Sequence, residues 1–384
     1  MPGNRDKKVV FLNHWAKMTG GAELSLIDIL KETALRADVV LICSEEGLLV
    51  KRCTELGIKS MIIPCKGNLG EIRRSGLLWT ALKKWKDVLG FFLYVLRLRR
   101  VILKIDPDAV HANVPKSHMA LFIIAALGYN KAAIFHIREI FNPGSFPFYL
   151  YRFLFPVRKS AAIAISNAVK NSLPKRVSEK TVLLYNGIEI PPSRIPHDGP
   201  PRFLYLGRVV PWKGCHLLIK AFSVLYKKYG PDAGTLDIIG STLYWSESYR
   251  DELKDQIASV GLSGKISLLP HTDSPQSVLI NHDVLCMASD REPFGRVAAE
   301  AQGASIPVAG FNSGGLPEIV ENGISGILVQ NGNTDKLAEA MEQYVVNPSI
   351  IEQMGKAGCE RVLKLFNRQT QIPLIVDFIL QNHI

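Results

Sequence analysis

The stretch Glu292-Pro-Phe-Gly-Arg-Val-Ala-Ala-Glu300 places two carboxylates eight positions apart, across a tight turn and the start of a helix. Short apolar strands are expected on either side, at residues 283–288 and 306–309, and the glycine pair Gly314-Gly315 follows the second strand. A strand, a turn with a carboxylate, a helix and another strand form a βαβ unit. Open α/β sheets bind ligands at the carboxyl edge, so the stretch predicts both a fold class and the place of a binding site.

The same alternation of apolar strands and helices extends along most of the chain in two runs. In the first run, strands are expected at residues 8–12, 38–43, 59–63, 109–111, 132–136, 161–165 and 181–184, with a helix at 22–35. In the second run, strands are expected at 203–206, 235–239, 265–268, 283–287, 306–309 and 326–329, with helices at 213–229, 246–260, 274–281 and 334–346. This pattern predicts parallel sheets covered by helices on both faces.

The two runs are separated by residues 191–201, where five prolines in eleven residues indicate a linker rather than the interior of a helix or strand. A length of 384 residues suits two domains better than one. We therefore expect a first domain at residues 1–190 and a second at 202–366, followed by a C-terminal segment at 367–384.

Positive charge is concentrated in the first half of the chain. Residues 1–190 contain 29 Lys and Arg against 15 Asp and Glu, whereas the rest contains 17 against 20. This asymmetry suggests different partners for the two halves. A basic nucleic-acid-binding protein is one interpretation, but nothing in the sequence resembles an RNA-recognition strand motif, a zinc finger or a helix-turn-helix.

The cysteines and the N-terminus favour an intracellular protein. The six cysteines form no CxxC pair, so we interpret them as buried thiols and not as a metal site or disulfide framework. The first eight residues lead directly into a strand without the apolar segment of a signal peptide. No apolar run approaches the ~20 residues that span a bilayer. We expect a cytoplasmic location.

The motif from Glu292 to Glu300 resembles the donor-sugar motif of glycosyltransferase family 4, whose members are retaining enzymes with the GT-B fold. Further segments match that family in the same order: Gly20–Glu23, Ser166–Val169, Asn186–Glu189, Gly207-Arg208, Lys213-Gly214 and Glu321–Val329. The resemblance covers about residues 7–366. It implies an α/β protein of two Rossmann-like, doubly wound domains facing across a cleft, with the acceptor on the first domain and the nucleotide sugar on the second. It also implies that the segment 367–384 returns to the first domain.

A sugar nucleotide presents a diphosphate that gains negative charge when the glycosidic bond breaks, and that charge needs a metal or fixed cations. The resemblance implies that Arg208 and Lys213 clamp the diphosphate, in the loop that Gly207 begins. The string Asp106-Pro107-Asp108 could suggest a metal site, but it precedes a strand and lies at the amino edge of the sheet. We interpret that string as a turn and expect no metal and no cofactor besides the co-substrate.

The two carboxylates divide the work in the resembled family. Glu292 is expected to contact hydroxyls of the donor sugar, and Glu300 the ribose hydroxyls. The backbone N–H groups of Phe294, Gly295 and Arg296, at a helix start, are suited to hydroxyl or phosphate oxygens. A simpler role for Glu292, as a carboxylate near a helix N-terminus, is compatible with this function.

In the first half, His136 closes an expected strand and resembles the histidine that family members place beside the reacting sugar. His111 and Arg138 are candidates for the acceptor side. Gly20 and Gly21 precede a helix and would let the backbone approach the diphosphate or the acceptor, although a glycine pair there is also ordinary turn chemistry.

One residue departs from the family pattern, and one segment outside the expected site is unusually basic and aromatic. Ser305 stands where the family usually has glycine after the helix of the second glutamate, which puts the local geometry in doubt. The segment 72–104 combines nine Lys and Arg with five aromatic residues. It suits either an anionic membrane surface or a helix packed on the sheet. The first alternative would place the protein at the inner face of the cell membrane.

We therefore predict a retaining glycosyltransferase that transfers a sugar from a nucleotide sugar to a glycan or glycolipid acceptor, and that does not bind nucleic acid. Contacts to the base are expected near residues 240–242 and 269–272. A sugar-nucleotide 2-epimerase, which shares the fold and needs no acceptor, is the alternative.

Overall fold

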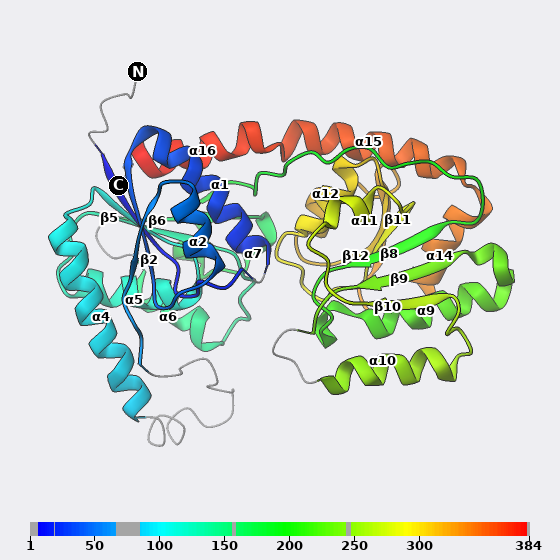
Figure 1. The fold of residues 1–384 in the computed structure, drawn as a ribbon, viewed down its shortest axis with the longest axis horizontal. Helices are drawn as coiled ribbons and strands as arrows, with labels where there is room; N and C mark the ends of the chain where they lie inside the picture. Colours follow the sequence, from blue (N-terminus) through cyan, green and yellow to red (C-terminus); the bar gives the residue numbers. More distant parts are fainter. Residues whose placement is uncertain (1–6, 19, 67–84, 156–158, 243–246, 382–384) are drawn as a thin grey trace. The chain divides into compact units, whose positions relative to one another are not determined.

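The computed structural model describes residues 7–18, 20–66, 85–155, 159–242 and 247–381 (Figure 1). The chain forms two compact units. The first unit comprises Met1–Ile165, Lys170–Leu184 and Ile372–Ile384, and the second comprises Ser166–Val169 and Tyr185–Gln371. The segment 72–84, which belongs to the predicted membrane-binding stretch, lies outside the described residues.

The first unit contains a parallel seven-stranded sheet in the order β3-β2-β1-β4-β5-β6-β7. Its strands are β1 (Lys8–Leu12), β2 (Asp38–Cys43), β3 (Lys59–Ile62), β4 (Ala109–Ala112), β5 (Ala132–Ile137), β6 (Ser160–Ala164) and β7 (Thr181–Leu183). Its helices are α1 (Gly21–Arg36), α2 (Leu48–Glu55), α4 (Trp85–Ile105), α5 (Pro115–Ala126), α6 (Phe146–Leu154) and α8 (Lys175–Ser178). The strand order reverses direction at β1, where Val9 pairs with both Val39 and Ala109.

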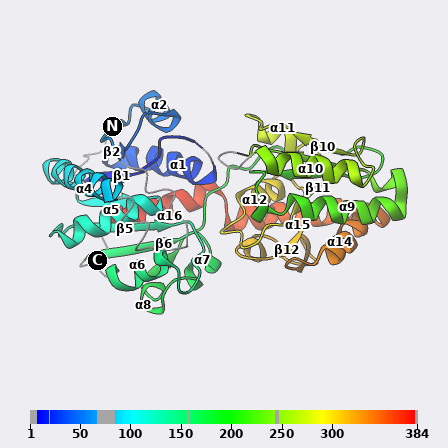
Figure 2. The ribbon, with the colours of Figure 1, turned by 90° about the horizontal axis from the view of Figure 1, so that it is seen from below.

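That reversal separates the helices into two layers. Connections between parallel strands are right-handed. A helix that connects two strands in one direction along the sheet therefore covers one face, and a helix that connects strands in the other direction covers the opposite face. The steps through β1, β2 and β3 place α1 and α2 on one face, and the steps from β3 to β6 place α4, α5 and α6 on the other. Figures 1 and 2 show α1 and α6 on opposite sides of this sheet.

The second unit contains a parallel six-stranded sheet in the order β10-β9-β8-β11-β12-β13. Its strands are β8 (Arg202–Leu206), β9 (Thr235–Ile239), β10 (Ile266–Leu269), β11 (Val284–Met287), β12 (Val308–Asn312) and β13 (Gly326–Gln330). Its helical segments include η2 (Pro211–Lys213), α9 (Cys215–Tyr229), η3 (Gly230–Ala233), α10 (Glu247–Ser259), α11 (Pro275–Leu279), α12 (Arg296–Gly303), α13 (Leu316–Ile319), α14 (Thr334–Val346) and α15 (Ser349–Leu365). Two short or shared helices, α7 (Asn167–Asn171) and α16 (Arg368–Gln381), complete the described chain.

Two Rossmann-like α/β sheets confirm the predicted fold class. Most predicted bounds differ by one or two residues from those of the structure, and two of the differences have a clear structural cause. The helix expected from residue 213 begins at Cys215, because Gly214 is left-handed at φ +73° and an added Cβ there would lie 2.1 Å from the carbonyl oxygen of Ala288. The strand expected at 306–309 runs from Val308 to Asn312, and Pro307 contributes only its carbonyl, which accepts from Leu285 N at 3.0 Å.

The C-terminal segment is more helical than expected. Pro373 suggests a break, and we expect at most one short helical run after it, yet α16 is a continuous 14-residue helix. Its apolar residues recur at helical spacing and are buried: Ile372, Ile375, Val376, Ile379 and Leu380. They pack in one core with residues of β1, β2, α1 and α2. This packing offsets the hydrogen bond that the proline removes.

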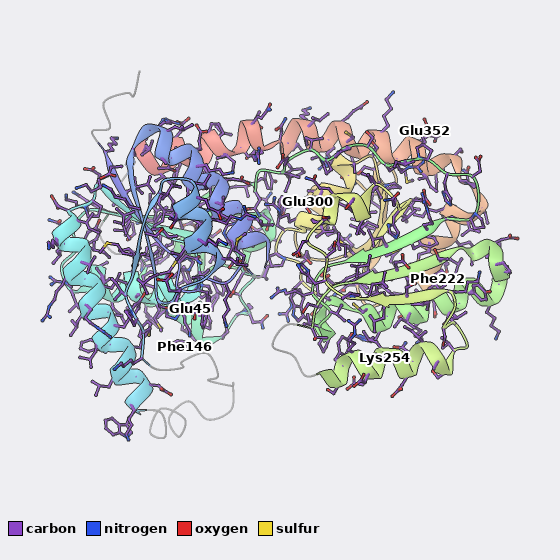
Figure 3. All side chains as sticks on the ribbon, viewed as in Figure 1. Glu45, Phe146, Phe222, Lys254, Glu300 and Glu352 are labelled. Carbon is purple, nitrogen blue, oxygen red and sulfur yellow. The ribbon has the colours of Figure 1, made fainter. Side chains whose placement is uncertain are left out.

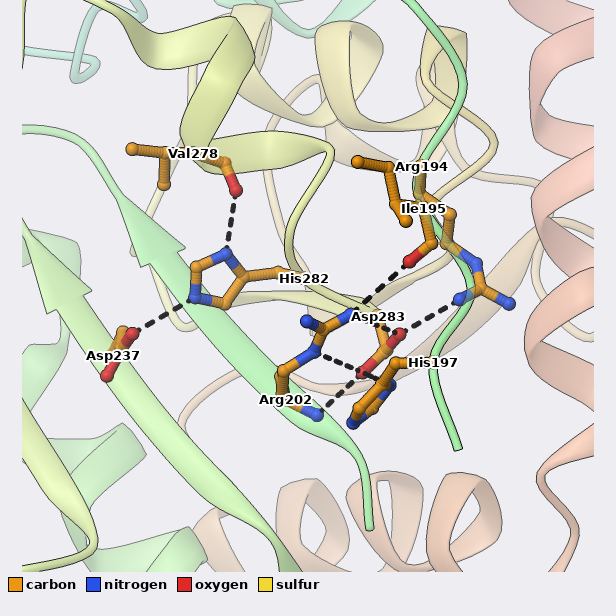
Figure 4. Close-up of polar contacts among 8 residues, drawn as sticks. All are labelled: Arg194, Ile195, His197, Arg202, Asp237, Val278, His282 and Asp283. Atoms are coloured by element: carbon orange, nitrogen blue, oxygen red, sulfur yellow. Dashed lines mark hydrogen bonds and ion pairs between the residues drawn. The ribbon is translucent and has the colours of Figure 1, made fainter. Parts of the chain in front are cut away.

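Residues 191–201 form no helix or strand, as the proline content indicates, but they are firmly held (Figure 4). Asp283, which is 2% exposed, accepts from Arg194 Nη1 at 2.9 Å and from Arg202 N at 2.9 Å, and its carboxylate lies 3.4 Å from His197 Nδ1. A buried carboxylate with two cations fixes this segment to the amino ends of β8 and β11.

Two further findings concern the whole described chain. No helix in the described ranges is both long and apolar enough to cross a membrane. All six cysteines are free thiols, and four of them are buried, whereas Cys65 and Cys359 are partly exposed.

Candidate functional site

The loop after β8 carries the two cations of the predicted clamp. Tyr205 Oη donates to the carbonyl oxygen of Arg208 at 2.6 Å and fixes the turn that follows Gly207. The short helix η2 then presents Trp212, whose ring centroid lies 5.5 Å from the guanidinium of Arg208 and 4.4 Å from Lys213 Nζ. Both cations are therefore attracted to the same indole ring, which orders them within one loop.

Lys213 forms an ion pair with Glu292, a residue 79 positions away in the sequence. The two side chains are only 13% and 11% exposed, so little water screens the pair. The contact joins the loop after β8 to the loop after β11 at the carboxyl edge of the sheet. It brings together two segments that sequence analysis treats as separate motifs.

The glycine pair after β12 explains how Glu292 is held. Gly315 N donates to the carbonyl oxygen of Glu292 at 2.7 Å. Gly314 is left-handed at φ +61°, and an added Cβ would lie 2.1 Å from that same oxygen. Only glycine permits so close an approach, so the pair allows one loop to close over the backbone of the other.

Helix α12 begins at the second half of the motif. Gly295 is its N-cap at φ +96°, and Arg296 Nε donates to Glu300 Oε1 at 2.8 Å. Burial raises the pKa of the Glu300 carboxyl, and the neighbouring Arg296 opposes that rise. Phe294 is 3% exposed and its ring packs near Phe366, so its side chain belongs to the core and is not presented to a ligand. Figure 3 labels Glu300 on the second unit.

The Ser166–Val169 motif forms the start of helix α7, and a carboxylate from α13 caps its backbone N–H groups. Glu318, in the Leu316–Ile319 helix α13, accepts from the backbone N–H groups of Asn167 at 2.7 Å and Ala168 at 2.9 Å. Ser166 Oγ donates to the carbonyl oxygen of Pro293 at 2.5 Å. The Ser166–Val169 motif therefore orders the main chain beside the glutamate loop, and it brings no reactive group of its own.

In the first unit, His136 and His111 form a buried pair. His111 Nε2 lies 3.1 Å from His136 Nδ1, and both side chains are fully buried. Arg138 Nη2 lies 3.4 Å from the same His136 nitrogen. The pKa of each imidazole is lowered well below its usual value, chiefly by burial and further by Arg138. Both histidines are therefore neutral at pH 7, and His111 lies within the sheet, in contact with His136.

Two asparagines that sequence analysis missed extend this network. Arg138 Nε donates to Asn113 Oδ1 at 2.8 Å, and Asn113 Nδ2 donates to Asn13 Oδ1 at 3.0 Å. Asn13 follows β1 and Asn113 follows β4, so both lie at the carboxyl edge of adjacent strands. A polar residue directly after a buried strand was the signal available for each.

The tautomer of a further buried histidine follows from its partners. His118 Nε2 lies 3.0 Å from the carbonyl oxygen of Ala112, which can only accept, so this nitrogen carries the proton. Tyr151 Oη therefore donates to His118 Nδ1 at 2.6 Å. These bonds tie α6 through α5 to the end of β4.

The remaining sequence candidates are placed as follows. Gly20 is the N-cap of α1 with an extended backbone, and an added Cβ there would meet no atom within 4 Å. Gly21 is the first residue of that helix. Asp108 Oδ2 accepts from Lys8 N at 2.8 Å, and Asp106 pairs with Lys131 at 2.6 Å, as turn residues at the amino edge. Within the described residues, no group of three or more His, Cys, Asp or Glu side chains could hold a metal ion.

Comparison with known families identifies the class of protein. Residues 19–190 match the family model described as Glycosyltransferase Family 4, and residues 188–361 match the model described as Glycosyl transferases group 1. Together the two models account for almost the whole described chain. The chain therefore consists of two glycosyltransferase domains of the family 4 type, as its motifs indicate, and it has the GT-B fold.

Individual relatives agree with this assignment. The capsular polysaccharide biosynthesis glycosyltransferase CapM of Staphylococcus aureus is 33% identical over 43% of this chain and 42% of its own length. The glycosyltransferase MJ1178 of Methanocaldococcus jannaschii is 26% identical over 73% of this chain and 77% of its own. The chain thus matches less than half of the first relative's length, but most of the second's.

Solved structures share the fold. Alr3699/HepE of Anabaena, in complex with UDP-glucose, superposes with a TM-score of 0.80 at 22% identity, over 98% of this chain and 99% of its own. Sucrose-phosphate synthase of Thermosynechococcus elongatus gives a TM-score of 0.78 at 19% identity, over 98% of each chain. These comparisons give no support to the alternative of a 2-epimerase.

Proposed function

We propose that the protein transfers a sugar from a nucleotide-diphosphate sugar to an acceptor hydroxyl with retention of configuration and without a metal ion. The observation that carries this proposal is the buried contact between Lys213 and Glu292, which joins a cation suited to a diphosphate to a carboxylate suited to sugar hydroxyls. Arg208, which contacts the same indole ring as Lys213, supplies a second charge.

Binding of the donor would exchange one set of contacts for another. Without ligand, Lys213 and Glu292 neutralise each other. With the donor bound, diphosphate oxygens take Lys213, and hydroxyls of the sugar donate to Glu292. Glu300 accepts from the ribose hydroxyls, and the N–H groups of Gly295 and Arg296 face phosphate or hydroxyl oxygens. Alr3699/HepE was solved with UDP-glucose, so a uridine nucleotide is the first donor to test.

The chemical step forms a bond between the acceptor oxygen and the anomeric carbon while the bond from that carbon to the diphosphate breaks. Arg208 and Lys213 stabilise the charge that develops on the departing diphosphate. For retention, the acceptor attacks from the face that the diphosphate leaves, and its hydroxyl proton passes to a diphosphate oxygen. His136 keeps the role beside the reacting sugar that the family resemblance implies, and because burial lowers its pKa it would add no fixed charge there.

We further propose a lipid-linked or growing surface glycan as the acceptor, on the side of His136 and Arg138, and peripheral membrane association through α4. CapM acts in capsular polysaccharide biosynthesis, and a further relative, LpsE of Rhizobium meliloti, in lipopolysaccharide core biosynthesis. Trp85, Leu89 and Phe92 on α4 are exposed, as an interfacial helix requires.

Thermal unfolding with UDP, GDP or ADP, and with the corresponding nucleotide sugars, tests the donor site. A ligand at 100 times its Kd should stabilise the folded protein by ~2.7 kcal/mol. We expect a shift with one nucleotide that persists in EDTA, which would identify the base and support a metal-free clamp. A shift abolished by EDTA would refute the metal-free clamp, and no shift with any nucleotide would refute the donor site.

A further inference from the structure

Helix α6 exposes an aromatic face that the glycosyl-transfer chemistry does not use. Four of its nine residues are large, apolar and exposed: Phe146 at 53%, Tyr149 at 44%, Phe153 at 74% and Leu154 at 36%. Spacings of three, four, seven and eight residues place them on one side of the helix. The opposite side is anchored by Tyr151, which is 2% exposed and donates to His118. The aromatic face is therefore presented outward by a firmly attached helix.

Helix α4, on the same face of the sheet, presents a matching surface. Five apolar side chains in its N-terminal half are exposed: Trp85, Val88, Leu89, Phe92 and Leu93. Three cations in its C-terminal half are exposed as well: Arg97, Arg100 and Lys104. Helix α5 contacts α4, and most of its own residues are buried. We call the exposed sides of α4 and α6 the outer face of the first unit.

The charge of this outer face selects its partner. Helices α4, α5 and α6 contain a single acidic residue, Asp87. Arg152 on α6 and Lys159 just after it are exposed cations. Aromatic rings beside Lys and Arg suit the boundary between acyl chains and anionic headgroups, where each cation is attracted to the negative surface. An acidic protein partner would match the cations but would leave Phe146, Tyr149 and Phe153 without an apolar phase.

We propose that the outer face docks on an anionic lipid bilayer and that α6 is its aromatic anchor. This inference rests on the proposed transfer to a lipid-linked acceptor and extends it. Figure 3 labels Phe146, at the N-terminal end of α6. That end follows β5 after His136 and Arg138, so it lies toward the carboxyl edge of the sheet. A bilayer held by α6 would deliver a lipid headgroup to the edge that carries the buried histidine pair.

Flotation with phosphatidylcholine vesicles, with and without phosphatidylglycerol, tests the anchor. We compare the wild-type chain with the triple variant Phe146→Ser, Tyr149→Ser, Phe153→Ser. The matched control is Ile324→Ser, Val346→Ser, Leu363→Ser, whose side chains in the second unit are 53%, 53% and 45% exposed. We expect the α6 variant to lose more than about tenfold in binding to anionic vesicles and the control to change less than about twofold. Circular dichroism verifies that each variant is folded.

A second variant tests the electrostatic part. Replacing Arg97, Arg100 and Lys104 by Gln should weaken binding to anionic vesicles at low salt, and high salt should remove the difference from wild type. Unchanged vesicle binding by the α6 variant, or no binding by the wild-type chain, overturns the proposal. So does a finding by sedimentation that the α6 residues mediate self-association, because a second copy would then cover the face.

Failure of docking can be separated from failure of the transferase. Transfer to a water-soluble acceptor should be equal in wild type, α6 variant and control, because none of the replaced residues belongs to the proposed site. Equal transfer without any vesicle binding would reject the anchor alone. Absence of nucleotide binding in all three proteins would reject the transferase and leave the vesicle result interpretable.

Discussion

Lys213 is the residue on which the proposed chemistry depends most. Replacing it by Ala removes a cation that would stabilise the leaving diphosphate. It also leaves the nearly buried Glu292 carboxylate without its partner cation. We expect kcat/KM to fall more than ~100-fold for Lys213→Ala, and similarly for Arg208→Ala, as when a charge-stabilising donor is removed. Steady-state transfer kinetics measure this loss. Lys220→Ala, an exposed cation on α9, is the control, and near-normal turnover in both site variants would contradict the clamp.

Ser305 explains why its position usually requires glycine. The residue follows α12 at φ +61°, a left-handed conformation that a residue with a Cβ adopts at a cost. The backbone is held there because Gly355 approaches it so closely that an added Cβ would lie 2.1 Å from the carbonyl oxygen of Ser305. Ser305 is therefore held in a conformation that glycine would adopt without a steric cost.

We therefore expect Ser305→Gly to raise the free energy of unfolding by about 0.5–1 kcal/mol, because relief of backbone strain exceeds the entropy that glycine adds to the unfolded chain. Urea unfolding measures the change. Ser223→Gly, in the middle of α9, should instead lower stability by a similar amount, since its backbone is helical. Destabilisation by both substitutions would contradict the strain at Ser305.

At the scale of elements, the carboxyl ends of β1, β4 and β5 and the start of α5 bury four histidines in neutral form. Burial lowers the pKa of His14 and of His118 to about 4, and it also lowers the pKa of His111 and of His136 well below the usual value. In the unfolded chain each histidine titrates near ~6.5. At a pH between the folded and the unfolded pKa values, these histidines are protonated in the unfolded chain and neutral in the folded chain.

Stability from these groups is therefore fully present above pH 6.5 and declines as the pH falls toward 4. The free energy of unfolding should decrease by up to ~1.4 kcal/mol per pH unit for each buried histidine. Urea unfolding at pH 7, 6 and 5 measures the slope. His118→Gln should make it shallower, and His271→Gln, whose side chain is 69% exposed, should leave it unchanged. A stability independent of pH in this window would contradict the buried neutral state.

At the scale of the whole molecule, the last helix completes a core built mainly from the first sixty residues. The buried side of α16 packs with Val9, Leu41 and Leu26 although more than three hundred positions separate them in the chain. Ile375→Ala or Ile379→Ala should cost ~2–5 kcal/mol of unfolding free energy, by loss of transfer energy and creation of a cavity. Leu374→Ala, on the exposed side of the same helix, should change it by less than ~0.5 kcal/mol. Urea unfolding measures these changes. Equal losses from the substitutions on the buried side and on the exposed side of α16 would contradict this packing.

Much of the fold could be predicted because its signals are local. Strands at 8–12, 38–43 and 235–239 begin and end where the apolar runs do, since a strand buried on both faces needs a continuous apolar run. The errors occur where a distant contact overrides the local pattern. The close contact with Ala288 leaves no room for a side chain at Gly214, where α9 is delayed, and the first unit's core keeps α16 helical through Pro373.

The sequence alone determined the fold class, the family and the order of the motifs, because periodicity and spacing are written in neighbouring residues. It did not contain the pairing of Lys213 with Glu292, the closure of Gly314 over the glutamate loop, or the burial of His111 against His136. Nor did it decide which aromatic residues of α4 and α6 pack inward and which remain exposed. Only the tertiary structure decided these points, because each depends on segments far apart in the chain meeting at one sheet edge or in one helix layer.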